Sequence, residues 1–350
     1  MSVIFVGPKL NPVTGQSLAF HNLTNNYHND KLILEYGGRS LLFQILSIIY
    51  GFFKMLYYLM FNKCSTMYIT TSRSKFGFFR DFLFINLANY YSLNIVNHLH
   101  GADFKDFYLS LHPWLKKIVY KTYCKVSTSI VLLPKMKEQY DMFDNMQVVA
   151  VDNGCAFPKI IPDFNDKKHK QILYLSNVMY SKGITFLIDA VDIIKKQGID
   201  IKLVITGNIL GDNYMSKNEM TTVFYEKIRN KKYIEYVGPV SGKIKENLLH
   251  ESLYFVLPSF YKTEAQPLSL IEAMFNGCIC ITTNHNYLSD MVSVHNGCIV
   301  RTENFNDISD YIISNIEDRE YQGKIFSLNV DYSYNRFSLD KHINKIISLL

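Results

Sequence analysis

The segment Pro258-Ser-Phe-Tyr-Lys-Thr-Glu264-Ala-Gln-Pro267-Leu-Ser-Leu-Ile-Glu272-Ala-Met274 joins a predicted strand to a predicted helix. The five residues before it, Leu-Tyr-Phe-Val-Leu at 253–257, have the length and composition of a buried strand. Proline is favoured at the first position of a helix, where its missing N–H would have no partner in any case. The pattern therefore places Glu264 in a loop and Glu272 on the helix that follows.

Strand-like apolar runs alternate with helical patterns along the whole chain. The first half has such runs at 3–6, 66–70, 95–98, 129–133 and 148–151, and the second half at 172–175, 201–205, 233–237, 253–257 and 278–282. This alternation predicts an α/β protein with parallel sheets and crossover helices. A charged stretch marked by prolines, 158–170, separates the two series and is the predicted linker. Ligands of such sheets bind beyond the carboxyl ends of the strands, so site residues are expected there.

Composition predicts a folded protein with ample core. The chain has 350 residues, of which 48% are hydrophobic and 14% aromatic, which argues against disorder. Its six cysteines form no C-x-x-C pair, which is typical of reduced thiols in a cytosolic protein rather than of a disulfide or zinc framework. The first residues lead straight into an apolar strand without a basic head, so no secretory signal is expected.

The net positive charge of the chain comes entirely from its first half. Residues 1–165 hold 16 Lys and Arg against 10 Asp and Glu, whereas residues 166–350 hold 21 against 21. Aromatic residues are interleaved with this charge, as in Trp-Leu-Lys-Lys-Ile-Val-Tyr-Lys-Thr-Tyr-Cys-Lys at 114–125. Such a face suits an anionic membrane surface, where each nearby Lys or Arg contributes about 1 kcal/mol. Nucleic acid is not an expected partner, because the usual nucleic-acid-binding signatures are absent from the sequence.

Residues 41–61 are apolar enough to raise the question of a membrane span. Gln44, Ser47, Gly51 and Lys54 interrupt this stretch. A charge at the middle of a spanning helix costs about 2.5 to 3.5 kcal/mol on insertion scales. The pattern therefore favours a mostly buried or membrane-skimming helix over a spanning one.

The segment that contains Glu264 and Glu272 resembles the E-x7-E motif of the retaining glycosyltransferases of family 4. Further landmarks of that family follow in order: Phe-Val-Gly-Pro at 5–8 with Thr-Gly-Gln at 14–16, Asn-His-Leu-His-Gly at 97–101, Val-Val-Ala-Val-Asp-Asn-Gly at 148–154, Ile-Leu-Tyr-Leu-Ser-Asn-Val-Met-Tyr-Ser-Lys-Gly at 172–183, Leu-Val-Ile-Thr-Gly at 203–207, Tyr-Val-Gly at 236–238 and Gly-Cys-Ile-Cys-Ile-Thr at 277–282. These landmarks cover nearly the whole chain.

The resemblance implies the GT-B fold, in which two Rossmann-like domains face each other and the C-terminal helix crosses back to the first domain. Residues 1–160, together with a last helix at 333–350, would form the acceptor-binding domain. Residues 161–332 would form the domain that binds the nucleotide sugar.

Lys182 precedes the helical pattern at 184–194, so it is predicted to stand at a helix N-terminus. The helix dipole disfavours a cation there unless an anion is shared, and the resemblance implies that this anion is the donor diphosphate. The family often has a basic residue where this chain has Asn177. Either Asn177 donates amide hydrogen bonds to the diphosphate, or another basic residue reaches it.

The resemblance also assigns roles to the segment quoted first. Glu272 would accept hydrogen bonds from the two ribose hydroxyls, a task suited to a carboxylate with two acceptor oxygens. Glu264 would bind hydroxyls of the transferred sugar near the reacting carbon. The main-chain N–H groups of Leu268 and Ser269, at the start of the helix, would point at the phosphate.

Three candidates lie in the first half. His98 and His100 share one face of a strand-like run, but no nearby Cys, Asp or Glu completes a convincing metal ligand set. His100 lies at the end of the strand, and the resemblance implies that it contacts the donor sugar or the acceptor. Asp103 is close enough in sequence to share an acceptor site. Gly15 follows the first strand, where the absence of a side chain would let backbone approach the phosphates or the acceptor.

The resemblance thus implies a retaining, metal-independent hexosyl- or N-acetylhexosaminyl-transferase without a cofactor. Its donor would be a UDP- or GDP-sugar, and its acceptor a glycan or polyprenyl-linked glycan of bacterial O-antigen lipopolysaccharide or capsule synthesis. Such an enzyme would be cytoplasmic and peripheral on the inner face of the plasma membrane. Two alternatives stay open: a catalytically silent GT-B glycan-binding or scaffold protein, which the lack of a basic residue at Asn177 keeps open, and a nucleotide-sugar 2-epimerase, which the landmarks fit less well.

Overall fold

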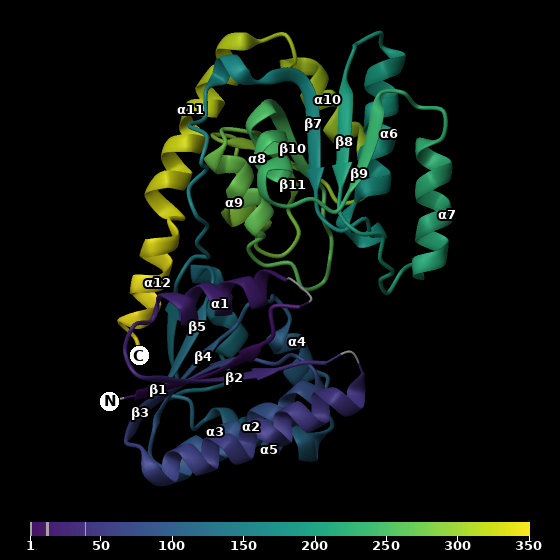
Figure 1. Cartoon of the computed structure of the whole chain (residues 1–350). Coiled ribbons are helices and arrows are strands. Elements are labelled where there is room, and N and C mark those ends of the chain that lie inside the picture. Colours follow the sequence, from purple (N-terminus) through teal and green to yellow (C-terminus); the bar gives the residue numbers. More distant parts are fainter. Residues whose placement is uncertain (1, 12–13, 39) are drawn as a thin grey trace. The chain divides into compact units, whose positions relative to one another are not determined.

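The structure, a computed structural model, describes residues 2–11, 14–38 and 40–350. It divides the chain into two compact units (Figure 1). Unit 1 comprises Met1–Gly154 and Leu339–Leu350, and unit 2 comprises Cys155–Ser338. The chain thus passes between the units after residues 154 and 338, whereas the sequence placed the crossings after 160 and 332.

Over its described residues, unit 1 contains a parallel sheet of six strands in the order β2-β1-β3-β4-β5-β6. The strands are β1 (Ser2–Pro8), β2 (Lys31–Tyr36), β3 (Cys64–Thr70), β4 (Asn94–His98), β5 (Thr128–Val131) and β6 (Gln147–Ala150). The helices are α1 (Gly15–Asn26), α2 (Leu41–Phe61), α3 (Lys75–Tyr90), α4 (Phe104–Leu109), α5 (Pro113–Tyr123) and α12 (Leu339–Ile347), with a 3-10 turn η1 (Pro134–Tyr140).

Helices cover both faces of this sheet (Figure 1). Phe5 of β1 packs in one cluster with Phe20 of α1 and Ile343 and Ile346 of α12. On the other face, α2 contacts β2 and α3, and α3 contacts β4 and α5. Each crossover helix buries one side on the sheet, which is the arrangement that parallel strands require.

Over the described residues, unit 2 has a second parallel sheet of six strands, in the order β12-β11-β10-β7-β8-β9. Its strands are β7 (Lys168–Leu175), β8 (Lys202–Thr206), β9 (Ile234–Gly238), β10 (Ser252–Leu257), β11 (Ile279–Thr283) and β12 (Gly297–Val300). Its helices are α6 (Ile184–Lys196), α7 (Lys217–Ile228), α8 (Gly242–Glu251), α9 (Leu268–Phe275), α10 (Phe305–Asn315) and α11 (Arg319–Arg336), with 3-10 turns η2 (Phe164–Asp166), η3 (Tyr180–Lys182) and η4 (Leu288–Asp290).

The predicted α/β class with parallel sheets is confirmed, since each unit is a Rossmann-like sheet of parallel strands with crossover helices. Two strands, β2 and β12, were not predicted, and both lie at sheet edges. The last helix was predicted as one piece at 333–350. The structure instead ends α11 at Arg336 and starts α12 at Leu339, and an isolated bridge between Ser338 and Cys155 marks the break.

Among the described residues, α2 is long and apolar enough to cross a membrane, but only 17% of its most apolar 18-residue window is buried. The mostly buried alternative is therefore wrong, and the membrane-skimming alternative stays a prediction. Burial is limited to a stripe of Ile48, Gly51, Met55 and Leu59, whose spacing keeps them on one side of the helix.

Candidate active-site residues

The strand order of unit 2 reverses between β10 and β7, because β8 follows β7 on one side and β10 lies on the other. Crevices for ligands form at such reversals, beyond the carboxyl ends of the strands. Lys182, at the end of η3 after β7, and Glu264, in the loop after β10, meet there in an ion pair with Nζ and Oε2 2.5 Å apart. The Ser259 hydroxyl donates to the same carboxylate oxygen at 2.8 Å. Lys182 and Glu264 are largely buried, with side chains only 13% and 9% exposed.

Gly183 positions Lys182 at the entrance of α6. Its φ of +78° is in the left-handed region, and a Cβ there would lie 2.1 Å from the carbonyl oxygen of Pro258. The N–H of Phe260 also donates to the carbonyl of Ser181 at 2.8 Å. The loops that follow β7 and β10 are therefore in direct backbone contact, and a residue with a side chain at 183 would separate them.

An aspartate that the sequence did not point to anchors the same loop. Asp212 accepts hydrogen bonds from the Ser181 hydroxyl at 2.6 Å and from its N–H at 2.8 Å. Partial burial raises the pKa of Asp212, but these bonds and those from the N–H groups of Tyr214 and Met215 lower it by more, so the net direction is downward. An ionised Asp212 thus holds the turn before Lys182.

Two further groups surround the Lys182–Glu264 pair and were not predicted. The Lys182 ammonium lies over the Tyr261 ring, 4.5 Å from its centroid. His285, in the loop after β11, has Nε2 3.1 Å from the Tyr261 carbonyl oxygen, so Nε2–H donates. Burial lowers the pKa of His285, as does Lys182, and this outweighs the Tyr261 bond and the Glu264 charge, which raise it. His285 is a long way from Lys182 in sequence, and no local pattern signals that they meet.

The second carboxylate lies on α9, as the sequence predicts, and Pro267 caps this helix instead of opening it. Leu268 and Ser269 are the first two residues of α9, and N–H groups at this position lack a partner within the helix. Glu272 pairs with Lys245 of α8, with Oε1 and Nζ 2.6 Å apart. No sequence signal pointed to Lys245.

Asn177 lies exposed in the loop after β7. The backbone of this loop is held from both sides: Tyr174 donates its hydroxyl to the Asn177 carbonyl at 2.8 Å, and Gly207, with φ of +119°, sits against Ser176. A Cβ on Gly207 would lie 2.0 Å from the Ser176 carbonyl oxygen. The Asn177 side chain therefore projects from a fixed loop at the carboxyl edge of the sheet.

In unit 1 the strand order reverses between β1 and β3. Arg73, in the loop after β3, lies against Gly101, where a Cβ would be 1.9 Å from its Nη1. The same guanidinium pairs with Asp103, with Nη1 and Oδ1 2.5 Å apart. The predicted acceptor residue Asp103 is thus held by an arginine that the sequence did not point to, directly beside His100.

His100 belongs to a cluster of three imidazoles in unit 1. Its ring centroid lies 3.9 Å from that of His98, and the His98 ring lies 6.1 Å from that of His342 on α12. His98 is bonded through Nδ1 to the Tyr68 hydroxyl and His342 through Nδ1 to the Asp152 carbonyl, at 2.7 and 2.6 Å. The Nε2 atoms of all three are buried without a partner among the described residues.

Burial lowers the pKa of all three histidines. For His100 the value falls to about 3, with nearby His342 and Arg73 as further causes. The cluster is therefore neutral at pH 7, and His100 can accept or donate a hydrogen bond without carrying charge.

Gly15 is the first residue of α1, after the N-cap Thr14, whose hydroxyl accepts from the N–H of Ser17 at 3.1 Å. The helix packs closely on β1, because a Cβ on Gly7 would lie 2.3 Å from the Phe20 ring. Part of the loop before Gly15, at residues 12 and 13, lies outside the described residues. Gly15 follows β1 and His100 follows β4, so both belong to the carboxyl edge of the unit 1 sheet.

No group of three or more His, Cys, Asp or Glu side chains within the described residues has a geometry that could hold a metal ion. The cysteines are free thiols there. Burial raises the pKa of Cys155, Cys278 and Cys280, so these three thiols are protonated at pH 7.

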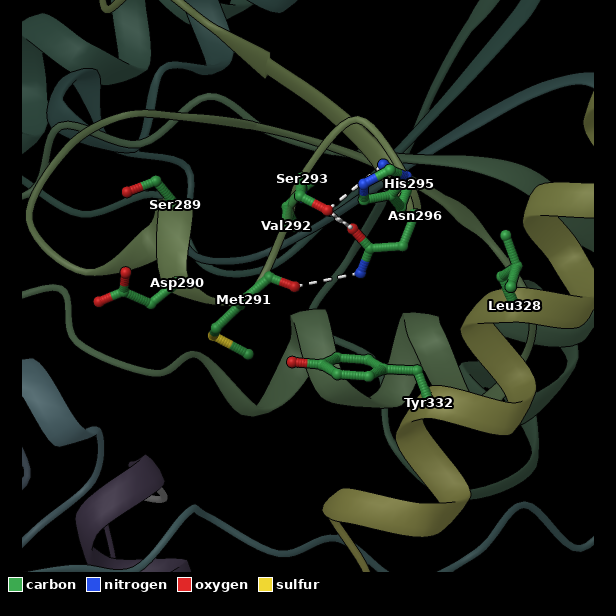
Figure 2. Close-up of a pocket in the computed structure, with 9 residues that line it drawn as sticks. All are labelled: Ser289, Asp290, Met291, Val292, Ser293, His295, Asn296, Leu328 and Tyr332. Atoms are coloured by element: carbon green, nitrogen blue, oxygen red, sulfur yellow. Dashed lines mark hydrogen bonds between the residues drawn. The ribbon is translucent and has the colours of Figure 1, made fainter.

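Unit 2 also contains a cavity of about 260 Å³ (Figure 2). The loop after β11 and two residues of α11, Leu328 and Tyr332, line it. Asn296 closes one wall by donating to the Met291 carbonyl at 3.1 Å. None of the predicted site residues is in its lining.

Comparison with known proteins finds a family that part of the chain resembles. Residues 158–326 match the family model described as Glycosyl transferases group 1. This segment is therefore similar to the group 1 glycosyl transferases. It coincides with most of unit 2 and includes Lys182, Glu264 and Glu272.

One curated relative is the capsular polysaccharide biosynthesis glycosyltransferase CapH of Staphylococcus aureus, 32% identical over 136 residues. The matched stretch spans 39% of this chain and 36% of CapH. Among solved structures, Anabaena HepE in complex with UDP and glucose aligns with a TM-score of 0.75 at 12% identity, over 100% of this chain and 99% of that one. Sucrose-phosphate synthase of Thermosynechococcus elongatus aligns with a TM-score of 0.76 at 14% identity, over 100% and 98%. These likenesses confirm the predicted GT-B class of fold.

Proposed function

We propose that this protein is a glycosyltransferase that moves a sugar from a nucleoside diphosphate donor to a glycan acceptor, with the family 4 type of E-x7-E site. The observation that carries the proposal is the buried Lys182–Glu264 pair at the strand-order reversal of unit 2, immediately before the N-terminus of α9. The group 1 domain match and the relative CapH support the reaction class. The UDP and glucose complex of HepE supports a UDP-sugar as donor, with a GDP-sugar as the other candidate.

The donor would be bound by unit 2. Its diphosphate would be the anion that Lys182 and the N–H groups of Leu268 and Ser269 stabilise, because cations and helix N-termini are the usual phosphate ligands. Glu272 would bind the ribose hydroxyls. The nucleoside would then either displace Lys245 from Glu272 or bind beside it. Glu264 would then be released to the sugar hydroxyls, since the diphosphate replaces it as the partner of Lys182.

The reaction would retain the configuration of the sugar and need neither a metal ion nor a cofactor. The departing diphosphate carries the negative charge that develops as the anomeric bond breaks, and the fixed Lys182 ammonium would stabilise it. The same phosphate would take the proton of the attacking acceptor hydroxyl. Asn177 would donate its amide hydrogens to the diphosphate from the neighbouring loop.

The acceptor would be bound by unit 1, where neutral His100 would contact an acceptor or sugar hydroxyl and the Arg73–Asp103 pair would flank it. We propose a hexosyl or N-acetylhexosaminyl donor and an acceptor of bacterial surface polysaccharide synthesis, either free or polyprenyl-linked. CapH supports a capsule over an O-antigen. A lipid-linked acceptor would place the enzyme at the inner face of the plasma membrane.

Calorimetric titration with UDP, GDP, ADP and CMP tests the donor assignment. Binding of one nucleoside diphosphate in the micromolar range, lost in Glu272→Ala, is the expected result. Glu251→Ala is a matched control, because Glu251 ends the neighbouring helix α8 and pairs with the exposed Lys168. Undiminished binding by Glu272→Ala would remove Glu272 from the site, and no binding of any nucleotide would favour a catalytically silent protein.

Sugar transfer in excess chelator tests the metal-independent assignment. Full activity without added Mg²⁺ or Mn²⁺ is expected, because Lys182 and the α9 N-terminus would replace the cation. A strict requirement for either ion would contradict it.

A further inference from the structure

The exposed side of α2 is an extended apolar feature of unit 1. Large apolar side chains that are 41% to 69% exposed run along its whole length: Leu41, Leu42, Phe43, Leu46, Ile49, Tyr50, Phe53, Tyr57, Met60 and Phe61. Soluble proteins expose single apolar residues freely, but contiguous apolar patches mark binding surfaces.

Helix α3 extends this surface. Phe76, Phe79 and Phe82 are each more than a third exposed. Phe76 and Phe79 line an apolar hollow of about 240 Å³ together with Ile45 and Ile48 of α2. We call the exposed sides of α2 and α3 the apolar face.

Several exposed lysines lie beside the apolar face. Residues 37–80 contain six Lys or Arg and no Asp or Glu, although Arg80 is buried in an ion pair with Asp81 and Arg73 pairs with Asp103. Lys54 on α2, Lys63 after it and Lys75 at the start of α3 are exposed. Helix α5, which contacts α3, adds Lys117 and Lys121 to the same side of the sheet (Figure 1). A large apolar surface with exposed lysines beside it matches the interface of an anionic lipid bilayer, where side chains enter the acyl region while ammonium groups meet phosphates.

We propose that the apolar face is a membrane-docking surface, in which α2 lies in the plane of an anionic bilayer with its exposed side among the lipids. This goes beyond the proposed glycosyl transfer and is measured without donor or acceptor, so its failure would leave that reaction untouched. It develops the membrane-skimming alternative expected for residues 41–61 and adds α3 to the contact.

The sheet argues against a spanning α2. The strands on either side of it in sequence, β2 and β3, both pair with β1, since Val3 faces Lys31 on one side and Thr66 on the other. The buried stripe of α2, including Gly51 against Phe84 of α3, rests on this assembly. A spanning helix would place its ends on opposite sides of the bilayer and would break these pairings.

Depth of insertion tests the orientation. Trp114 is the single tryptophan of the chain, so Trp114→Phe provides a background free of tryptophan. Into it, Leu46→Trp, Phe53→Trp and Met60→Trp are introduced one at a time; these sites are seven residues apart on one side of α2 and 50% to 62% exposed. The probe is a vesicle of phosphatidylglycerol and brominated phosphatidylcholine in equal parts.

Equal and strong quenching at the three positions is expected, because a helix in the plane keeps them at one depth. Quenching that is strongest at Phe53→Trp and weak at both ends would establish a spanning helix and overturn the proposal. If quenching is absent and the molecular mass in solution rises to that of a dimer as the protein concentration increases, the apolar face binds a second copy of the chain, and the proposal is overturned. If quenching is absent and the protein stays monomeric, the apolar face does not bind lipid, and the proposal is overturned as well.

Vesicle co-sedimentation of otherwise native protein tests the energetics. Leu46→Gln with Phe53→Gln should weaken binding about 100-fold, since burial of each such side chain contributes a factor of about ten or more. Glutamine is a good helix former, so α2 should persist. The matched control is Ile161→Gln with Val294→Gln, which removes two exposed apolar side chains from unit 2 and should leave binding unchanged. Equal binding by both double variants would overturn the proposal.

Charge is tested separately. Lys54→Gln with Lys63→Gln should weaken binding to phosphatidylglycerol vesicles about 25-fold, or about fivefold per charge, and leave binding to pure phosphatidylcholine unchanged. The control is Lys217→Gln with Lys232→Gln, two exposed lysines of unit 2. An equal loss in the control would mean that net charge, and not the apolar face, drives the contact.

Discussion

At the scale of single residues, the Lys182–Glu264 pair has two roles that can be separated. It joins the loops after β7 and β10, and it holds the Lys182 ammonium at the place where the donor diphosphate is expected to bind. Removing one partner of a nearly buried ion pair leaves the other charge uncompensated, which costs about 3 to 5 kcal/mol. Loss of activity in a single variant would therefore not by itself prove a catalytic role.

We predict that Lys182→Met lowers both the free energy of unfolding, by about 3 kcal/mol, and turnover, by about 100- to 1,000-fold. Lys182→Met combined with Glu264→Gln should regain stability, because no charge is left unpaired, but not turnover. Urea unfolding and sugar-transfer assays measure the two effects.

Recovery of turnover in the double variant would show that Lys182 is purely structural. Lys195→Met is the matched control, because Lys195 lies on α6, the helix that follows Lys182, and pairs with Asp200, whose side chain is 96% exposed. Exposed pairs contribute little, so its stability and turnover should change little.

The histidine cluster predicts how stability depends on pH. The pKa of His100 is about 3 in the folded protein and about 6.5 in an unfolded chain, so the unfolded state binds more protons between these values. The stabilisation is complete above pH 6.5 and is lost as pH falls towards 3, by about 1.4 kcal/mol per pH unit for this residue. His98 and His342 act in the same direction.

Urea midpoints measured between pH 7 and pH 4.5 test this. His100→Gln should reduce the slope of the free energy of unfolding against pH by about 1.4 kcal/mol per pH unit. His28→Gln, at an exposed position, serves as the control. An unchanged slope in His100→Gln would mean that His100 is not held neutral by its surroundings.

At the scale of elements, the entrance of α6 depends on a glycine. Gly183 and Gly198, just beyond the other end of α6, both have left-handed φ values, +78° and +81°. A Cβ at 198 meets nothing within 4 Å, whereas one at 183 meets the Pro258 carbonyl at 2.1 Å. Alanine would adopt the same unfavourable left-handed backbone at both positions, so the two substitutions differ only in the clash of the Cβ at 183 with Pro258.

We predict that Gly198→Ala costs about 1 to 2 kcal/mol of stability, as expected for a left-handed residue with a side chain. Gly183→Ala should cost about 1 to 3 kcal/mol more, because the added methyl group forces the β7 and β10 loops apart. It should also weaken UDP binding, while Gly198→Ala should not. Urea unfolding and calorimetry with UDP measure the difference, and equal effects of the two substitutions would contradict the close contact of the loops.

The strands that the sequence missed were both edge strands, for a common reason. β2 alternates buried with half-buried positions and carries Lys31 and the exposed Glu35, and β12 is a four-residue run that begins with Gly297. The predicted strands in the middle of each sheet are buried on both faces and give continuous apolar runs. An edge strand is paired on one side and gives a weaker, shorter signal.

At the scale of the whole molecule, the chain returns to unit 1 through α12. Ile343 and Ile346 pack with Phe5, Leu23 and Tyr27, and the Thr66 hydroxyl donates to the Leu350 carbonyl at 2.6 Å. His342, on the same helix, completes the histidine cluster. Unit 1 is therefore incomplete without the last residues of the chain.

We predict that Ile346→Ala lowers the free energy of unfolding of unit 1 by about 2 to 5 kcal/mol, the usual cost of removing a buried isoleucine. Nucleotide binding to unit 2 should not change, because α12 packs in unit 1. Lys345→Ala, at an exposed position on the same helix, should be nearly neutral. Urea unfolding followed by Trp114 fluorescence, which reports on unit 1, measures the loss, and a wild-type midpoint would contradict the packing of α12.

Local patterns in the sequence determined the parallel α/β class, the loop position of Glu264, the helical position of Glu272 and the place of Lys182 before α6, because hydrophobic periodicity and proline preference act over a few residues. The tertiary structure decided which groups meet: Lys182 with Glu264, Lys245 with Glu272, Arg73 with Asp103, and His342 with His98. It also decided that α2 exposes its apolar side. These outcomes depend on strand order and register between segments far apart in the chain, which the periodicity of any one segment does not encode.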